Sequence, residues 1–268
     1  MFRTSYLTRR APAVVFLLAI VFASTTCRRN SPETPSQTGP SGKDRGEPES
    51  TSTDQPYRSS LLDANTIPPR SRLSRTTILN TLADRFDYQS YLEVGQGRKE
   101  DNYNWVTCRR KVGVDPNRKV QAAFAMTSDE FFAQNHDSFD LIFIDGLHLA
   151  GQVERDILNS LAVLNSRGRI VVHDCNPTTE DMQRVPWQGQ HAWTGDVWKA
   201  WVKLRAARRD LEMSVVDVDS GCGIIRRGKQ ETIEPPAAWT YESFEQNRTK
   251  WLNLIEVKEF LRELKFSK

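Results

Sequence analysis

The strongest hydrophobic pattern in the chain is a short, unbroken apolar run at residues 141–144, bounded by Asp140 and by Asp145-Gly146. A run this short that is rich in Ile and Phe predicts a strand buried on both faces, as in a parallel sheet covered by helices. The strand leads into a loop that carries Asp145 and His148. Ligands of open α/β sheets bind beyond the carboxyl ends of the strands, so this loop is a candidate site. The structural alternative is that Asp145 caps the next helix and His148 is merely exposed.

Apolar runs and segments of helical spacing alternate along the chain after residue 73. Strands are expected at residues 90–94, 111–114, 141–144, 169–172, 212–218 and 223–226, with a weaker one at 120–125. Helices are expected at residues 74–85, 152–164, 196–208 and 243–264. This alternation predicts an α/β fold with a doubly wound, mostly parallel sheet, helices on both faces and a C-terminal antiparallel hairpin.

The N-terminal region has a different pattern. Arg3, Arg9 and Arg10 precede an uncharged apolar stretch at residues 11–23, and Cys27 follows it. This order predicts a signal peptide or membrane anchor at residues 1–27, and hence a membrane-associated protein. Thr26 departs from the small residue that usually precedes a lipoprotein cysteine, so an uncleaved anchor and a wrongly assigned start codon remain alternatives.

Residues 28–60 are rich in Ser, Thr, Pro and Gly and contain almost no apolar residues. Such a segment buries too little apolar surface to offset the entropy of ordering, which predicts a disordered linker. The main domain is then expected at residues 61–232, followed at residues 233–268 by a helical extension that packs on it.

The overall composition excludes some classes of function. The formal net charge of the 268 residues is +3, which is too small to indicate a nucleic-acid partner. The four cysteines are widely spaced and form no C-x-x-C pair, so neither a disulfide framework nor a zinc site is indicated.

The first predicted strand runs into a turn that contains glycine. Glu93 precedes the turn, and Gly95 and Gly97 let the backbone approach a ligand closely, although a tight turn without a ligand gives the same pattern. About twenty residues further on, Asp115 ends the next strand at the spacing of an acid that binds both ribose hydroxyls of a nucleoside. NAD and S-adenosylmethionine both fit these features. Ser128-Asp129 either caps a helix or contacts the adenine side of such a ligand.

Two later strand ends carry acids and imidazoles. Asp145 and His148 follow one strand, and His173 and Asp174 follow the next, so topology brings the four together. Paired carboxylates suit a hard divalent cation such as Mg²⁺, and His148 suits proton abstraction because an imidazole titrates near neutral pH. His173 is a ligand, a second base or a buried hydrogen-bonding residue.

Six segments in this order, YLEVG, KVGVDPN, TSDEFF, DLIFIDGLH, GRIVVHDCNP and WTGDVWKAWVKLR, resemble class I S-adenosylmethionine-dependent methyltransferases. They are similar to the bacterial branch with a V-D-P-N second strand and an I-D-G-x-H fourth strand, over about residues 73 to 227. The resemblance implies a Rossmann-like seven-stranded sheet and S-adenosylmethionine as cofactor. It also implies the cofactor contacts: Glu93, Gly95 and Gly97 on the methionine side, Asp115 on the ribose, Ser128 and Asp129 at the adenine, and Asp145 nearby.

Asp145 and His148 further resemble the D-x-x-H of metal-dependent sugar and antibiotic O-methyltransferases. That resemblance implies that Asp145 binds magnesium and that His148 is the base. The chain has His173-Asp174 where those enzymes carry an acidic pair, and it lacks a further glycine in the loop after the first strand. The expected function is O-methylation of a sugar, a glycan or another small hydroxylated acceptor, with the domain in the cytoplasm if it is active.

The long loop at residues 176–195 contains Trp187, His191 and Trp193. Loops of this length are often lids or substrate walls, and Trp faces stack on sugar rings, so Trp187, Trp193 and His173 are candidate acceptor contacts. Alternatively, these aromatics only hold the loop on the domain.

Two other functions stay open at this stage. A non-catalytic exported lipoprotein on a methyltransferase scaffold would explain the leader and the missing glycine. An NAD-dependent oxidoreductase is less favoured, because the third glycine of G-x-G-x-x-G would fall at Glu100.

Overall fold

The computed structural model describes residues 55–189 and 192–266. The strands are β1 (Ser90–Val94), β2 (Arg110–Val114), β3 (Phe139–Ile144), β4 (Leu164–Val172), β5 (Leu211–Val216), β6 (Cys222–Arg227) and β7 (Leu254–Ile255). The α-helices are α1 (Arg75–Phe86), α2 (Ser128–Gln134), α3 (Ala150–Val163), α4 (Val197–Ala207), α5 (Tyr241–Leu252) and α6 (Val257–Phe266). Short 3-10 turns occur at Arg70–Arg72, Tyr103–Trp105, Arg118–Val120 and Asp181–Gln183.

The strands form one seven-stranded sheet in the order β2-β1-β3-β4-β6-β5-β7. β1 to β4 are parallel, β6 runs antiparallel to both of its neighbours, and β7 is parallel to β5. This topology confirms the Rossmann-like, mostly parallel fold and the antiparallel hairpin of β5 and β6.

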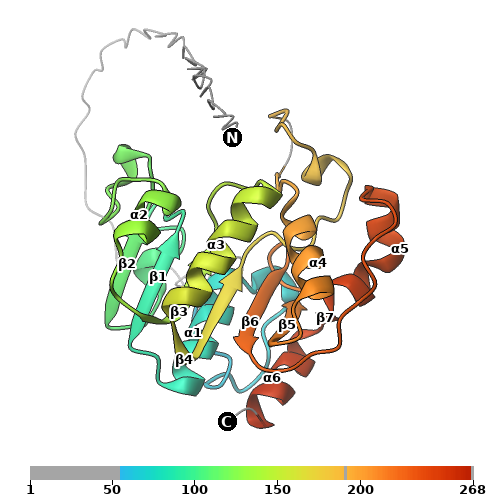
Figure 1. Cartoon of the computed structure of the whole chain (residues 1–268). Helices are drawn as coiled ribbons and strands as arrows, with labels where there is room; N and C mark the ends of the chain where they lie inside the picture. Colours follow the sequence, from blue (N-terminus) through green and yellow to red (C-terminus); the bar gives the residue numbers. More distant parts are fainter. Residues whose placement is uncertain (1–54, 190–191, 267–268) are drawn as a thin grey trace, which may run out of the picture. The chain divides into compact units, whose positions relative to one another are not determined.

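The central strand β3 is buried on both faces, as its apolar run predicted. Leu141 and Phe143 pack with α1, whereas Ile142 and Ile144 pack with α3 and α4. α3 and α4 accordingly cover one face of the sheet, and α1 and α6 cover the other (Figure 1). Each such side chain contributes about 1.5–3 kcal/mol of burial free energy, which fixes where β3 ends and therefore where Asp145 lies.

The start of α1 also bears on the site. Ser74 caps the helix, and its backbone N–H donates to Thr77 Oγ1 at 3.2 Å while the Thr77 amide bonds back to the Ser74 side chain. This capping box confirms the predicted start of the helix and fixes Arg75 as its first residue.

Two sequence predictions of secondary structure were wrong. Residues 120–125 do not form a strand: Gln121 has a φ of 54°, which interrupts the extended backbone, and only Phe124 makes an isolated bridge, to Val114. The single helix predicted at residues 243–264 is broken at Asn253 (φ 48°), after which Leu254–Ile255 pairs with β5 before α6 begins. The extension at residues 233–268 therefore contributes a strand to the sheet as well as packing helices.

The predicted linker, residues 28–60, is described only from Gln55 on. There the chain already contacts the domain, because the Tyr57 backbone N–H donates to Arg72 O at 2.8 Å and Ser60 Oγ donates to Asp84 Oδ2 at 3.0 Å. The leader predicted at residues 1–27 lies outside the described residues. Within the described ranges, none of the helices has the length and apolar character needed to cross a membrane.

Candidate active site

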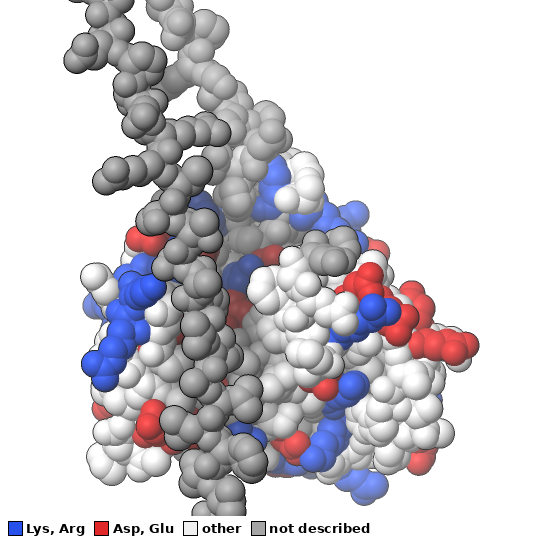
Figure 2. All heavy atoms as spheres, turned by 90° about the horizontal axis from the view of Figure 1, so that it is seen from above, with Lys and Arg blue, Asp and Glu red and all other residues white. Residues whose placement is uncertain are grey.

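The predicted site residues lie at the carboxyl ends of the parallel strands. Gly95 follows β1, Asp115 follows β2, Asp145 follows β3, and His173-Asp174 follow β4. In Figure 1 this edge lies at the top, below the loop that joins β4 to α4. The view from above shows a hollow in this surface that contains both basic and acidic side chains (Figure 2).

Two adjoining cavities occupy this edge. The first, called here the apolar pocket, has a volume of about 460 Å³ and extends from Gly95 past Asp115 to Ser128, Asp129 and Leu147. The second, called here the charged pocket, has a volume of about 430 Å³. Its walls include Arg75, Glu93, Asn102, His148, His173, Asp174, Trp193 and Asp219. Gly95, Gly97 and Asp145 line both, so the two pockets meet at the end of β1 and β3.

The glycine turn after β1 is required at this meeting point. Gly95 has a φ of 82°, and a Cβ placed on it would lie 2.3 Å from the backbone oxygen of Asp145. Any side chain here would clash with backbone that cannot move away, so only glycine fits. Gly97 has a φ of 54° and open space around it, and its N–H donates to Asp115 Oδ2 at 2.9 Å.

The far wall of the apolar pocket is formed by the first turn of α2. The N-cap of this helix is Thr127, which also shares a capping box with Glu130, so Ser128 and Asp129 are not the cap. Ser128 Oγ and Asp129 Oδ1 instead accept hydrogen bonds from Gln152 Nε2 at 3.1 and 3.3 Å. Both residues line the cavity, and α3 holds them through Gln152.

Glu93 lies on the charged side of the meeting point and is 1% exposed. Tyr91 Oη donates to Glu93 Oε2 at 2.8 Å, and Asn102 Nδ2 donates to Glu93 Oε1 at 3.2 Å. Burial outweighs these hydrogen bonds and raises the pKa of Glu93 to about 8. The side chain is therefore mostly a neutral acid near pH 7.

The sequence prediction that Asp145, His148, His173 and Asp174 converge is confirmed. His173 Nδ1 lies 3.2 Å from Asp145 Oδ1 and 3.3 Å from Asp174 Oδ1. Since it faces two carboxylate oxygens, this nitrogen carries a proton. Burial lowers the pKa of His173, but Asp174 and Asp145 outweigh it and hold the pKa well above its ordinary value. His173 is thus a buried, charged hydrogen-bonding residue, one of the three roles left open for it.

His148 lies between the same two carboxylates. Its Nε2 is 3.4 Å from Asp145 Oδ1, and its Nδ1 is 3.2 Å from both Asp174 Oδ2 and the backbone oxygen of Trp193. The two acceptors at Nδ1 place a proton there, whereas Nε2 faces the single carboxylate oxygen of Asp145. Burial lowers the pKa of His148, but contacts with Asp145 and Asp174 outweigh it and raise the pKa above 6.5.

Sequence reasoning missed two charged residues of this cluster. Arg75 Nη1 donates to Asp145 Oδ2 at 2.6 Å, and Arg75 Nε donates to Asp219 Oδ2 at 3.0 Å. Arg75 was interpreted only as part of a helix, and Asp219 only as part of a hairpin turn. Neither residue belongs to a local sequence motif. The packing of α1 on the sheet brings Arg75 to this edge, and the pairing of β5 with β6 brings Asp219 there.

The aromatic loop residues lie beside His148. Trp193 stacks on the His148 ring at 5.2 Å between centroids, and Trp187 stacks on Trp193 at 6.3 Å. Trp193 lines the charged pocket, whereas Trp187 is 58% exposed. His191, the third aromatic noted in this loop, lies outside the described residues.

The donor atoms of Asp145, His148 and Asp174 lie within 4.8 Å of one another, a set that by residue type suits a metal ion. Each of the four carboxylate oxygens, however, already contacts a nitrogen of Arg75, His148 or His173. Mg²⁺ takes about six oxygen ligands at about 2.1 Å, so binding it would require the displacement of these contacts. His173, one of the ligands predicted from the sequence, is not part of this set, and its Nδ1 faces the carboxylates of Asp145 and Asp174. The residues therefore do not fit a hard cation as they stand.

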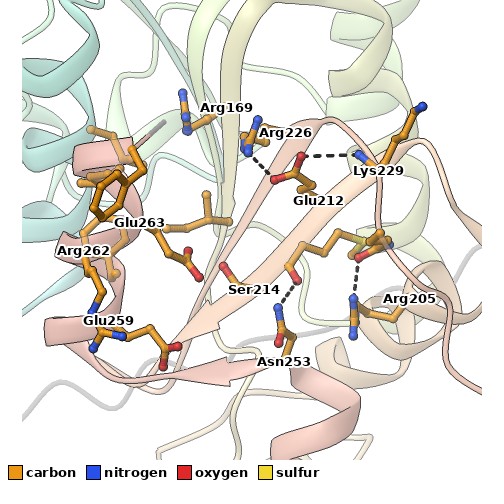
Figure 3. A pocket seen from close by; sticks show the side chains of 17 residues that line it. Arg169, Arg205, Glu212, Ser214, Arg226, Lys229, Asn253, Glu259, Arg262 and Glu263 are labelled. Atoms are coloured by element: carbon orange, nitrogen blue, oxygen red, sulfur yellow. Dashed lines mark hydrogen bonds and ion pairs between the residues drawn. The ribbon is translucent and has the colours of Figure 1, made fainter. Parts of the chain in front are cut away.

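A further cavity of about 500 Å³ lies apart from this edge, between α6 and strands β5 and β6 (Figure 3). Basic and acidic side chains alternate in it, and Arg226 pairs with Glu212. It shares no lining residue with the apolar or the charged pocket.

Comparison with known proteins adds one informative match. No curated protein matches the chain. Solved structures match distantly: cofactor-bound Rv0187 from MTB (15% identity, 60% of this chain and 84% of that chain, TM-score 0.45) and the O-methyltransferase TomG from Streptomyces achromogenes in complex with SAM (15%, 56% and 78%, 0.42). These likenesses are too distant to carry an argument. A family model described as a methyltransferase domain matches residues 75–175. The segment from Arg75 to Cys175, which supplies most residues of both pockets, is therefore similar to a methyltransferase domain.

Proposed function

We propose that the protein is an S-adenosylmethionine-dependent methyltransferase that methylates a hydroxyl oxygen of a small acceptor, such as a sugar or a glycan. The observation that carries the proposal is the junction of the apolar and the charged pocket at Gly95 and Asp145. There, an apolar pocket of about 460 Å³ shares lining residues with a charged pocket that has an imidazole at its wall. The matched methyltransferase segment, residues 75–175, contains this junction.

The apolar pocket suits the nucleoside end of the cofactor. Asp115 lies at the carboxyl end of β2, where an acid can accept both ribose hydroxyls, and its Oδ2 is already oriented by the Gly97 N–H. Ser128 and Asp129 would flank the adenine. The methionine end would then pass Gly95 and Gly97 toward Glu93, whose carboxyl would face the amino group.

When bound, S-adenosylmethionine supplies the methyl group: its C–S bond breaks, the electron pair stays on sulfur, and the acceptor oxygen forms the new bond to carbon. His148 Nε2 takes the hydroxyl proton, and Asp174 stabilises the resulting imidazolium through Nδ1. Asp145 helps to hold the ring in place. Much of the rate comes from the walls of the two pockets, which fix the oxygen in line with the methyl carbon.

The loop above the charged pocket suits an acceptor with flat apolar faces. Trp193 and Trp187 form a stack that begins on the His148 ring. A sugar ring resting on this stack would present a hydroxyl toward His148. His173 lies deeper in the charged pocket, where it would contact the acceptor only through the carboxylates.

We also propose that the N-terminal segment attaches the protein to a membrane, with the domain on the cytoplasmic side where S-adenosylmethionine is present. Fractionation of cells that express the full chain, with and without residues 1–27, tests attachment. Protease accessibility of the domain in intact cells tests its side of the membrane.

The reaction is tested by incubation of the full chain with S-adenosylmethionine and a panel of hydroxylated acceptors, starting with sugars. Acceptor-dependent formation of S-adenosylhomocysteine supports the proposal, and mass spectrometry of the product identifies the methylated atom. A folded protein that binds the cofactor but transfers its methyl group to none of the oxygen, nitrogen or sulfur acceptors offered would point to a non-catalytic scaffold.

A further inference from the structure

One guanidinium group joins the two sides of the charged pocket. Arg75 Nη1 donates to Asp145 Oδ2 at 2.6 Å, while Arg75 Nε and its backbone N–H both donate to Asp219 Oδ2 at 3.0 Å. Asp145 follows β3 and Asp219 lies in the β5–β6 turn, so the first residue of α1 links segments that are distant in the sequence.

The three acids Asp145, Asp174 and Asp219 gather in a largely buried space, with side-chain exposures of 16%, 8% and 26%. Carboxylates this close together stay ionised only when positive charge lies among them. In metal-dependent enzymes a divalent ion supplies that charge. Here, the Arg75 guanidinium lies between Asp145 and Asp219, and the His173 ring lies between Asp145 and Asp174.

In the described part of the chain, Arg75 also has a hydrogen-bond donor, Nη2, that is not in use. A guanidinium carries five N–H groups, and within the described part of the chain Nη2 makes no hydrogen bond. The Arg75 side chain is 29% exposed and lines the same pocket as His148. The positive charge is permanent, because a guanidinium is not deprotonated in proteins.

We infer that Arg75 takes the place of a divalent cation in this site, so that the reaction needs no metal. In this role the guanidinium neutralises Asp145 and donates a hydrogen bond from Nη2 to the acceptor oxygen. That bond strengthens as His148 removes the hydroxyl proton and negative charge develops on the oxygen. This inference rests on the proposed methyl transfer, but the metal titration that tests it does not.

The first test is titration of the full chain with Mn²⁺, followed by electron paramagnetic resonance, and with Mg²⁺, followed by calorimetry. The wild-type protein is expected to bind neither ion at millimolar concentration, and EDTA is expected to leave methyl transfer unchanged. Tight Mn²⁺ binding that is lost in Asp174→Asn, or loss of activity in EDTA that Mg²⁺ restores, would overturn the inference.

The second test removes the guanidinium. Arg75→Gln is expected to lower kcat on the order of 10²-fold or more with S-adenosylmethionine affinity unchanged, as for loss of a preorganised donor to a developing oxyanion. Because Asp145 and Asp219 then lack their cation, the variant is also expected to gain Mn²⁺ binding. An Arg75→Gln protein with wild-type kcat would contradict the proposed role.

Two controls separate this role from a purely structural one. Arg70→Gln removes a nearby ion pair, with Asp217 at 2.5 Å, that does not touch Asp145, and is expected to leave kcat and metal binding unchanged. If Arg75→Gln fails to fold, Arg75→Lys keeps the charge without the fork of donors, so it is expected to bind no Mn²⁺ and to lose kcat. Cofactor binding distinguishes failure of this inference from failure of the proposed function. A wild-type protein that binds both S-adenosylmethionine and Mn²⁺ refutes this inference alone. A wild-type protein that binds no S-adenosylmethionine refutes the proposed function.

Discussion

The apolar and the charged pocket meet at Gly95 and Asp145, yet they are built in different ways. The apolar pocket consists of backbone turns after β1 and β2 and the start of α2, and its shape depends on the absence of side chains at Gly95 and Gly97. The charged pocket is lined by side chains from α1, β1, the loops after β1, β3 and β4, and the β5–β6 turn, and ion pairs hold its acids. The apolar pocket is therefore sensitive to substitutions that add a side chain, and the charged pocket is sensitive to substitutions that remove a charged group.

The largest effect is expected from Gly95→Ala. The new Cβ would lie 2.3 Å from the Asp145 backbone oxygen at a φ of 82°, so strain and overpacking cost about 2–6 kcal/mol and displace the meeting point of the pockets. Urea unfolding and calorimetry with S-adenosylmethionine measure both consequences. Gly151→Ala is the matched control, because that position in α3 has open space and gains helix propensity. Equal behaviour of the two variants would refute the steric account of the apolar pocket.

The next effect concerns the charged pocket. His148→Ala is expected to lower kcat by about 10²–10⁴-fold, since it removes the general base, while the Kd for S-adenosylmethionine stays unchanged. Steady-state kinetics and calorimetry provide the two readouts. His136→Ala, an exposed histidine outside both pockets, serves as the control. Retention of full kcat in His148→Ala with normal cofactor binding would remove His148 from the mechanism.

The different construction of the two pockets also decides how much of each can be predicted from the sequence. Gly95, Asp115 and Asp145 each follow an apolar run that marks a strand end, so local pattern and strand order together predict them. Arg75 follows no such run, and Asp219 follows the predicted strand at 212–218 but lies in a hairpin turn rather than at the end of a parallel strand. Their positions depend on how α1 and the β5–β6 turn pack on the finished sheet.

In the C-terminal region, too, the local sequence pattern does not predict the tertiary arrangement. Phe244, Trp251 and Phe260 are buried, but the apolar pattern that predicted one helix at residues 243–264 does not register the left-handed backbone at Asn253. β7 then forms because Leu254–Ile255 lies beside the free edge of β5. Strand pairing of this kind is a tertiary effect that outweighs the helical pattern of the local sequence.

A smaller effect is expected for stability as a function of pH. The pKa of Glu93 is about 8 in the folded protein, against 4.5 as its ordinary value, so the folded state holds this proton more tightly than the unfolded state. The stability that Glu93 contributes is full below pH 4.5 and is lost as pH rises through 8, by up to a few kcal/mol. Glu93→Gln is expected to flatten this part of the profile in thermal unfolding between pH 5 and 9. An unchanged slope would mean that Glu93 is ionised in the folded state.

The pH dependence of the rate tests the role of His148 in the charged pocket. His148 must be neutral to accept a proton, and its contacts with Asp145 and Asp174 raise its pKa above 6.5. Activity is therefore expected to rise with pH along a limb centred above 6.5, and Asp174→Asn is expected to move that limb to lower pH. A kcat/KM profile for both proteins checks this, and a limb below 6.5 in the wild type would argue against His148 as the base.

The smallest effect is expected at the outer loop. Trp187 is 58% exposed and stacks on Trp193 rather than on His148, so Trp187→Ala is expected to raise the acceptor KM severalfold with kcat nearly unchanged. Trp239→Ala is the control, because that half-exposed tryptophan stacks on Trp198 instead. An equal change in KM for both variants would remove Trp187 from acceptor binding.

The most direct test of the central claim is calorimetric titration of the full chain with S-adenosylmethionine and S-adenosylhomocysteine. The account predicts saturable binding of both that is lost in Asp115→Ala and retained in Gly151→Ala. A folded wild-type protein that binds neither ligand would contradict it, because the apolar pocket would then hold no cofactor and the charged pocket would have no methyl donor.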